Sequence, residues 1–240
     1  MKINVTAIYN CGESVAPPDW YTKGLPRPYR LYYVIDGRAH YSLGGEKTGC
    51  FYLFPSSLPF TVEQDSDRRL NHLYYDFMMT PATVSAAPIC CSLDSHPLLP
   101  SLLDLMRKSV KGYRYEGHTE LFDTVKSALE AFLSLFFEIA KPKKDVSEDI
   151  VKALEYIEQN YSKEIKVKDI AELLYLDEDY FIKKFKTALG ITPYAYIKNL
   201  RMAVAKELYK NGETLKSAST AAGFKYPSSY CRAVSRKKKS

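Results

Sequence analysis

The sequence predicts an α+β fold in which a small N-terminal β-barrel with trailing helices is followed by an all-α domain. Three observations support this fold class. Over roughly the first eighty residues, aromatic and β-branched side chains are punctuated by Gly and Pro, as in a series of short strands. From about residue 98 the apolar residues recur at helical spacing. A charged segment around Pro142 then separates this region from a remainder that is helical throughout.

Composition and turn residues place the strands. Residues 29–35 (YRLYYVI) have strand composition and are followed by Asp36-Gly37, a typical hairpin signal. Residues 51–54 form a short apolar run that Pro55 closes, and residues 70–78 are predicted as a further strand. Short strands between turns indicate a small barrel or sandwich.

One long apolar stripe follows. It consists of residues spaced three or four apart, which are Leu121, Val125, Ala128, Leu129, Phe132, Phe136 and Ile139. This spacing places them on one face of a helix. The stripe can pack on its own barrel, on a second copy of the chain, or on both, and the sequence leaves these three arrangements open.

The segment 141–147, with its proline and its charges, is the expected linker between residues 1–140 and 148–240. The chain of 240 residues is long enough for one large or two small domains.

No apolar run approaches the roughly 20 residues of a membrane helix, so neither export nor membrane insertion is expected. The five cysteines are scattered and read as reduced thiols of a cytoplasmic protein. The four histidines lie far apart, so no metal and no cofactor is expected.

Charge is distributed unevenly along the chain. From Tyr180 to Ser240 there are 14 Lys and Arg but only two acids, Glu207 and Glu213, which gives a net charge of +12. Subtraction from the totals of 34 basic and 28 acidic residues leaves a net charge of −6 before Tyr180. A basic end on an otherwise acidic protein suggests a polyanionic partner, although a solvated face is an equally good explanation of the charge alone.

Two short helical units with similar patterns lie in the basic region. In the first, an apolar face of Val167, Ile170, Ala171 and Leu174 is followed by a break, which Asp177 ends as a helix cap. The next helix buries Phe181, Phe185 and Leu189 and leaves a polar and basic face outward. Two helices joined by a tight turn in this way describe a helix-turn-helix.

The same pattern returns about fifty residues later. Leu215, Ala218, Ser219 and Ala222 form the small apolar face, Gly223-Phe224 supplies the turn, and Pro227 begins the next helix. Between the units, Thr192 caps and Pro193 starts a helix that would fix their separation. Successive major grooves on one side of B-DNA are about 34 Å apart, so a rigid pair can engage two turns. An ordinary helical bundle is the alternative interpretation.

At these positions the sequence resembles the AraC/XylS family of transcription regulators, over about residues 148 to 237. The residues that carry the resemblance are Phe185-Lys186, Gly190-Ile191-Thr192-Pro193, Arg201, Ala205, Leu208, Gly223-Phe224, Pro227-Ser228-Ser229-Tyr230 and Arg232. Residues 29–37 and 52–59 resemble the cupin-type sensor domain of the same family. The resemblance implies a bacterial regulator with a cupin-like sensing and dimerisation domain and a double helix-turn-helix domain.

The family pattern implies that outward residues early in each second helix contact DNA. They are Asp179, Ile182, Lys183 and Lys186 in the first unit, and Ser229, Cys231 and Arg232 in the second. Arg232 is the strongest candidate, because a guanidinium can donate two hydrogen bonds to guanine. Lys183 suits a base or a phosphate and Lys186 a phosphate, whereas Asp179 suits the amino group of cytosine.

The sequence also departs from the family pattern. It has Ala218-Ser219 where the family usually has Ile-Ala, and Val234 where a phenylalanine is usual. The smaller side chains should weaken the second unit, by about 1–3 kcal/mol for the lost aromatic volume. The chain shown here also lacks a second closing segment of the Gly-x-Thr-Pro kind.

An effector site would lie inside the barrel. His72, Tyr74 and Asp76 share one face of their strand, and the resemblance places His72 and Tyr74 in the pocket. Arg27 and Arg30 lie near the start of the barrel and suit a hydroxyl-rich or anionic ligand. The alternative is that His72 is a core histidine and the tyrosines simply fill the barrel.

The sequence therefore predicts a non-enzymatic transcription regulator. Its expected partners are double-stranded DNA, a small-molecule effector for which a sugar is one candidate, a second copy of the chain in a homodimer, and RNA polymerase, with no membrane. Two alternatives are kept. A cupin metalloenzyme would need clustered histidines, and the barrel offers only the isolated His40 and His72. An interaction protein with degraded DNA recognition would bind DNA weakly and without sequence preference.

Overall fold

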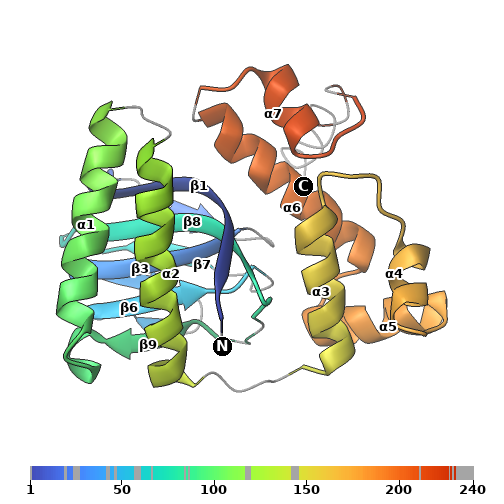
Figure 1. Cartoon of the computed structure of the whole chain (residues 1–240), viewed down its shortest axis with the longest axis horizontal. Coiled ribbons are helices and arrows are strands. Elements are labelled where there is room, and N and C mark those ends of the chain that lie inside the picture. The colour runs from blue at the N-terminus through green and yellow to red at the C-terminus, as the bar shows by residue number, and fades with distance from the viewer. Residues whose placement is uncertain are drawn as a thin grey trace.

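The fold is a two-sheet β domain with two helices on one outer face, beside a domain of five labelled helices (Figure 1). The computed structural model describes residues 2–18, 21–23, 28–41, 44–45, 48–56, 61–65, 67–83, 85, 87–116, 120–141, 146–210, 212–226, 228 and 230. The predicted class, α+β with strands first and helices last, is confirmed.

The strands form two antiparallel sheets. The strands of the first sheet, in spatial order, are β1 (Asn4–Val15), β8 (Asn71–Thr80), β3 (Tyr29–Asp36), β6 (Cys50–Phe54) and β9 (Ile89–Ser92). Those of the second sheet are β2 (Tyr21–Lys23), β7 (Thr61–Gln64), β4 (Ala39–Tyr41) and β5 (Gly44–Gly45). In the first sheet Tyr32 lies opposite Tyr74 on one side and Tyr52 on the other, which gathers aromatic rings at its centre.

The predicted hairpin at Asp36-Gly37 is wrong. Strand β3 pairs with β6 and β8, whereas β4 pairs with β5 and β7, so this turn carries the chain from one sheet to the other. Gly37 has a φ of 90°, and a Cβ there would lie 2.2 Å from the carbonyl oxygen of Arg69. The glycine is thus required by a close crossing of two backbones and not by a two-residue hairpin loop.

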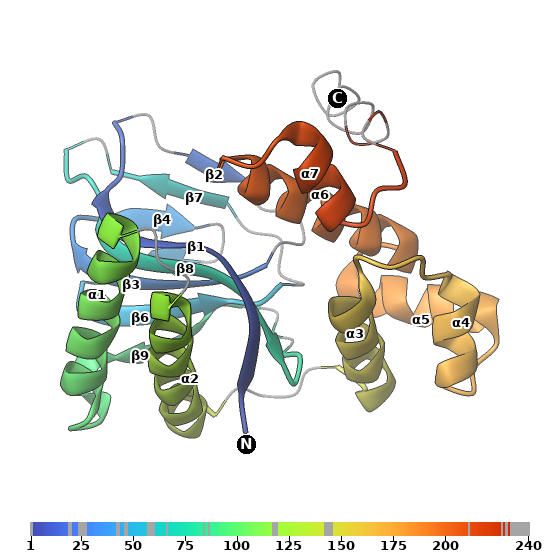
Figure 2. The same cartoon turned by 45° about the horizontal axis from the view of Figure 1, so that its top comes forward.

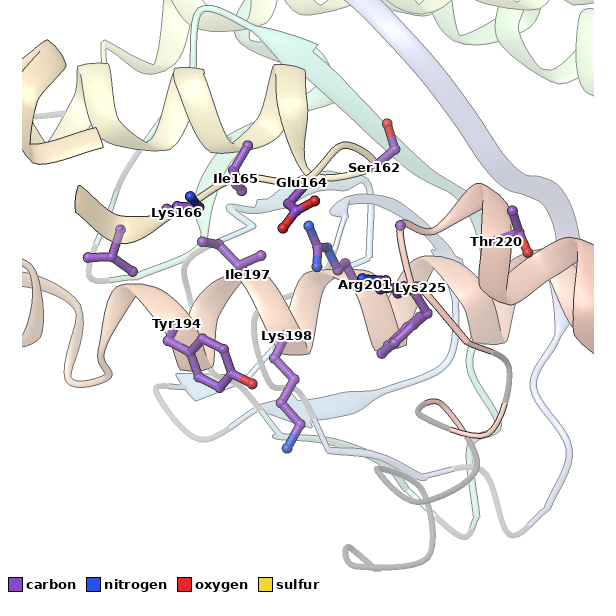
Figure 3. Close-up of a pocket in the computed structure, with 13 residues that line it drawn as sticks. Ser162, Glu164, Ile165, Lys166, Tyr194, Ile197, Lys198, Arg201, Thr220 and Lys225 are labelled. Atoms are coloured by element: carbon purple, nitrogen blue, oxygen red, sulfur yellow. The ribbon is translucent and has the colours of Figure 1, made fainter. Parts of the chain in front are cut away.

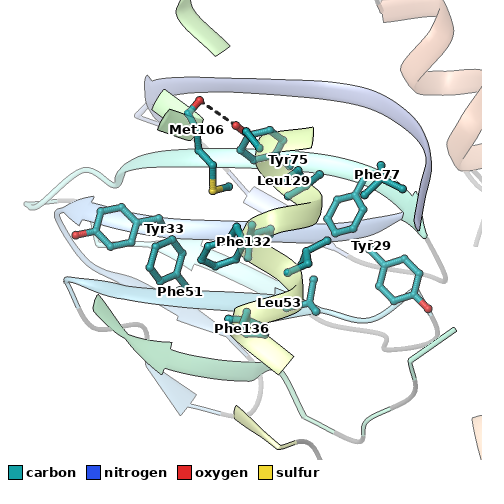
Figure 4. Close-up of a cluster of buried hydrophobic side chains, with 14 of the residues drawn as sticks. Tyr29, Tyr33, Phe51, Leu53, Tyr75, Phe77, Met106, Leu129, Phe132 and Phe136 are labelled. Carbon is teal, nitrogen blue, oxygen red and sulfur yellow. Dashed lines mark hydrogen bonds between the residues drawn. The ribbon is translucent and has the colours of Figure 1, made fainter. Parts of the chain in front are cut away.

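Helices α1 (Leu99–Glu116) and α2 (Glu120–Ala140) cover the outer face of the first sheet (Figure 2). A short 3₁₀ turn, Leu93–Ser95, leads from β9 toward them. The predicted stripe of α2 packs on this sheet within the same chain, and Phe132 lies 4.5 Å from Phe51 between ring centroids (Figure 4). The Tyr75 hydroxyl donates to the carbonyl oxygen of Met106 at 3.1 Å, which ties β8 to α1. Packing on the chain's own sheet is therefore the arrangement observed.

The opposite face of the first sheet looks toward the second sheet. A separate apolar cluster fills this space, made of Ala16, Tyr32, Val34, Ala39, Tyr52, Phe54, Val62 and Leu70. Tyr74 packs against the same cluster. The predicted division of residues 72–77 into two faces is confirmed, because Leu73, Tyr75 and Phe77 belong to the core under α1 and α2.

The second domain is entirely helical in its described part. Its helices are α3 (Glu148–Asn160), α4 (Val167–Leu173), α5 (Glu178–Leu189), α6 (Pro193–Lys210) and α7 (Leu215–Ala221). Helix α2 ends at Ala140 and α3 begins at Glu148. Nowhere in the described ranges is a helix both long and apolar enough to cross a bilayer.

Candidate nucleic-acid interface

Helices α4 and α5 form the first predicted helix-turn-helix. Tyr175, in the turn, has a φ of 56° and is 97% exposed, so the chain reverses there in a left-handed conformation. Asp177 then caps α5, as predicted, because its Oδ1 accepts a hydrogen bond from the backbone N–H of Tyr180 at 3.1 Å. At the other end Gly190 adopts a φ of 74° and closes the helix.

The buried and exposed faces of α5 lie where the sequence predicts them. Phe181 and Phe185 are fully buried, and their rings meet edge to face at 5.7 Å. Asp179, Lys183 and Lys186 are exposed, and the Ile182 side chain is half-buried. An exposed basic face on a helix anchored by two aromatic rings has the form of a recognition helix.

Lys184 has a different role from its neighbours. It forms an ion pair with Asp149 of α3, while its ammonium lies 5.8 Å from the centroid of the Tyr180 ring. This lysine fastens α5 to α3 and is not free to contact DNA. The sequence shows three lysines close together on one helix and does not indicate which of them is structural.

Helix α6 spans the distance between the two units. Its start is capped as predicted, since the Thr192 Oγ1 accepts from the backbone N–H of Ala195 at 3.3 Å. Arg201 donates from Nε to the carbonyl oxygen of Tyr161 and from Nη2 to that of Lys163, both at 2.6 Å. These bonds hold the turn after α3 against α6, so Arg201, which carries part of the family resemblance, positions the first unit on the connecting helix.

The second unit is described as far as its turn. Thr214 caps α7 by accepting from the backbone N–H of Ser217 at 3.1 Å. The buried Ser219 donates its hydroxyl to the carbonyl oxygen of Lys216 at 3.1 Å, so the serine that departs from the family pattern is satisfied locally. Gly223 has a φ of 85°, and a Cβ there would lie 2.6 Å from the Tyr161 carbonyl oxygen. The turn of the second unit therefore lies directly against the backbone of the turn after α3 at this glycine.

Three of the predicted base contacts lie outside the described residues: Ser229, Cys231 and Arg232. So does Val234. Tyr230, which lies among them, is buried, and its ring packs against Phe224 at 5.7 Å. Tyr230 therefore faces the interior of the domain.

A groove of about 1000 Å³ runs between the two units (Figure 3). Its walls are the turn from Ser162 to Val167 on one side and the segment from Thr220 to Lys225 on the other, and α6 forms its floor. Tyr194, Lys198 and Arg201 follow one another along α6 at intervals of one turn. Sequence reasoning missed this groove, because its cations come from three separate segments.

Three of the four predicted effector residues, Arg30, His72 and Tyr74, come together between the sheets. Arg30 donates from Nε and Nη2 to the two carboxylate oxygens of Asp76, at 2.5 and 2.6 Å, and from Nη1 to the Tyr32 hydroxyl at 3.2 Å. The His72 ring lies 4.8 Å from that of Tyr32 and 5.4 Å from that of Tyr74. Burial, together with the charge of Arg30, lowers the pKa of His72 to about 4, so the imidazole is neutral at physiological pH. Arg27 lies outside the described residues.

A polar cluster joins the two domains, and sequence reasoning missed it as well. The Ser56 hydroxyl, on the segment after β6, donates to Glu158 Oε1 of α3 at 2.5 Å and lies 3.0 Å from the Tyr196 hydroxyl of α6. Burial raises the pKa of Glu158 to about 8, so this side chain is mainly a neutral acid at pH 7. Nearby, the Tyr9 and Tyr161 hydroxyls are 2.5 Å apart.

Apolar residues extend this junction. Tyr9, Met78 and Ala82 of the β domain pack into the core of the helical domain with residues such as Ile157 and Leu200. The one available signal in the sequence is Glu158 itself, a carboxylate directly beside the apolar face of α3. No group of three or more His, Cys, Asp or Glu side chains placed to hold a metal ion occurs in the described portion of the chain.

Comparison with known proteins identifies relatives over most of the chain. The family model "Helix-turn-helix domain" matches residues 170–239. The chain is 37% identical over 236 residues to the lactose operon transcription activator of Staphylococcus xylosus, a match that covers 90% of this chain and 83% of the relative. It is 22% identical over 250 residues to the raffinose operon regulatory protein RafR of Pediococcus pentosaceus, with coverage of 94% and 87%.

Solved structures of ToxT from Vibrio cholerae share the fold. One, bound to a naphthalenyl butenoic acid, aligns with a TM-score of 0.61 at 14% identity over 96% of this chain and 92% of ToxT. Another, with an unsaturated fatty acid bound, aligns with a TM-score of 0.58 at 14% identity over 95% and 88%. The relatives named here are transcription regulators, a class of protein that is not enzymatic. The chain belongs to the AraC/XylS family of DNA-binding transcription regulators.

Proposed function

We propose that this regulator controls a sugar-utilisation operon, reads its DNA site through two helix-turn-helix units and responds to a sugar bound in the β domain. Residues 1–140 would sense the effector and pair with a second copy of the chain, 141–147 would link, and 148–240 would bind DNA. In the cytoplasm, the homodimer would contact RNA polymerase from its DNA site.

The basic face of α5 is the observation that carries the DNA-binding part of the proposal. Lys183 and Lys186 are exposed and, among the ion pairs of the described residues, neither has an acidic partner. In this assignment Asp179, Ile182 and Lys183 face base edges and Lys186 a phosphate. Ser229, Cys231 and Arg232 would do the same for the second unit, with Arg232 on a guanine.

The effector assignment rests on the aromatic and polar side chains that meet between the sheets. Aromatic rings with a few fixed polar groups are typical of small-molecule sites, and Tyr32, His72 and Tyr74 form such a wall. Arg30 is paired with Asp76, so it would donate hydrogen bonds to a ligand from a fixed position and would not move as a free cation. The relatives named for lactose and raffinose operons favour a sugar, whereas the ToxT structures favour a fatty acid.

DNA binding is tested with the purified chain and a fragment of its own upstream region, against a scrambled duplex of equal length. We expect a preference for the upstream fragment that survives competition, and loss of most of that preference in Lys183→Ala and Arg232→Ala. Lys108→Ala is the matched control, because it removes the same charge from an exposed position on α1. Equal affinity for both duplexes would contradict sequence-specific regulation and favour an interaction protein.

The effector is tested by thermal unfolding in the presence of lactose, raffinose or an unsaturated fatty acid. A ligand that binds only the folded chain raises the midpoint temperature, Tm, to an extent that grows with its concentration. We expect a rise with a sugar that is lost in Tyr74→Ala. A rise with the fatty acid alone would contradict the sugar assignment and leave the DNA-binding result untouched.

A further inference from the structure

The groove between the two helix-turn-helix units is lined mainly by positively charged side chains. It is lined by four cations, Lys166, Lys198, Arg201 and Lys225, and one described acid, Glu164. The groove thus carries a net charge of about +3, concentrated where the two units meet.

The four cations also lack the partners that other lysines of the domain have. Lys152 pairs with Glu148 at 3.0 Å, Lys168 with Glu172 at 3.7 Å, and Lys184 with Asp149. Among the described side chains, none of the four groove cations makes an ion pair. Four cations with a single described acid among them repel one another, and an anion in the groove would lower this cost.

Arg201 is the most constrained of the four. Its Nε and Nη2 donate to backbone carbonyl oxygens, so its position is fixed, and Glu164 is the one described acid that acts on its charge. Lys198 lies one turn earlier on α6, and Tyr194, 69% exposed, one turn before that. Figure 3 shows Tyr194 and Lys198 pointing away from α6 on its outer side. Tyr194 and Lys198 thus present a hydroxyl and a cation on the same side of α6, and phosphates accept hydrogen bonds from side chains of both kinds.

The position of the groove indicates which anion would bind there. Two units that read successive major grooves on one side of B-DNA are separated by about one helical turn. The minor groove and the sugar-phosphate backbones beside it fill that interval. The groove is walled by the turn before α4, which leads into the first unit, and by the turn after α7, which belongs to the second unit.

We infer that this groove holds the DNA backbone between the two major-groove segments, with Lys198 and Lys225 as phosphate contacts and Arg201 as a fixed positive anchor. The inference rests on the proposed function and adds a sequence-independent contact to it. The contact holds the two units in register on the duplex.

The test measures the salt dependence of binding to the upstream fragment and to the scrambled duplex, from about 50 to 200 mM salt. Lys198→Gln and Lys225→Gln should each weaken binding to both duplexes equally, by about fivefold at low salt. Each should also reduce the slope of log K against log salt by about one. Lys152→Gln is the matched control, because Lys152 is exposed on α3, lies outside the groove and is paired with Glu148.

The possible outcomes separate the groove assignment from the proposed function. An unchanged salt slope in both groove variants would overturn the inference, and so would a loss confined to the upstream fragment, because that would indicate base contacts. If wild-type protein shows no sequence preference but the groove variants still lose slope, the proposed function fails and the groove assignment stands. If wild-type protein binds no DNA at low salt, both fail. The Tm of each variant checks that it folds.

Discussion

Replacing Glu158 by glutamine should stabilise the protein at neutral pH. Glu158 is 4% exposed, its Oε1 accepts from Ser56 and Tyr196, and its Oε2 has no hydrogen-bond partner among the described residues. No described cation pairs with it. Glutamine has the same shape and keeps the accepting oxygen, but it never ionises.

The magnitude follows from the difference between the two states. The pKa of Glu158 is about 8 in the folded chain, against an ordinary value of 4.5 that applies when the chain is unfolded. The folded state therefore binds the proton more tightly, and the free energy of unfolding falls as pH rises from 4.5 to 8. A pH of 7 lies about 2.5 units above the pKa of Glu158 in the unfolded chain and still below its pKa in the folded chain. Each unit corresponds to about 1.4 kcal/mol, so the wild-type carboxyl costs about 3 kcal/mol of stability relative to a neutral group.

The assay is chemical denaturation followed by circular dichroism at about pH 5, 6, 7 and 8. The stability gain of Glu158→Gln over wild type should be small at about pH 5 and about 3 kcal/mol at about pH 7. Glu138→Gln, at an exposed position on α2, should show no such trend. Subtracting the free energy of unfolding of the wild type at each pH cancels the pH-dependent contribution of His72, which both proteins share. A gain that does not grow with pH, or a loss at the highest pH, would refute the idea that the junction holds a neutral acid.

Further predictions concern the backbone, a cap and the buried ion pair, all measured as the free energy of unfolding by chemical denaturation. Gly223→Ala should cost at least about 2 kcal/mol, because the positive φ strains an alanine there and its Cβ would also clash with the Tyr161 carbonyl oxygen. Gly190→Ala should cost only about 1 kcal/mol, because that position has the positive φ but open space around it. Equal losses in the two variants would contradict the clash at Gly223. Asp177→Ala should cost about 1 kcal/mol, and no change would mean that the cap is dispensable. Asp76→Asn should cost about 3 kcal/mol by leaving Arg30 charged and buried, and the double variant Arg30→Met/Asp76→Leu should recover much of it; a double variant as unstable as the single one would contradict this reasoning.

The sequence predicts best what local chemistry determines. The caps at Asp177 and Thr192 and the inward phenylalanines of α5 follow from residues within one or two helical turns, and the structure confirms each of them. The stripe of α2 is equally clear, but periodicity alone does not distinguish a sheet from a second chain as its partner. The contact between Phe132 and Phe51 decides this, and it joins residues far apart in the sequence.

What the sequence does not reveal depends on tertiary placement. Arg30 has the chemistry to bind a ligand directly, but it is held by Asp76, which lies on another strand. Asp36-Gly37 has hairpin composition, yet only the position of Arg69 shows that the chain crosses between sheets there. Lys183 and Lys184 are neighbours of the same kind, and only the ion pair with Asp149 shows that Lys184 has a structural role.

The core shared by the two domains limits how such regulators can be recombined. A chimera that joins this helical domain to another sensor would leave the Tyr196 and Glu158 side chains facing a foreign surface, without the Ser56 hydroxyl that hydrogen-bonds to both. Tyr161 would likewise lose Tyr9. A functional hybrid must therefore carry the segment after β6 and the middle of β1 along with the helices. A biosensor designer should choose the crossover points by junction contacts and not by the boundary of the linker.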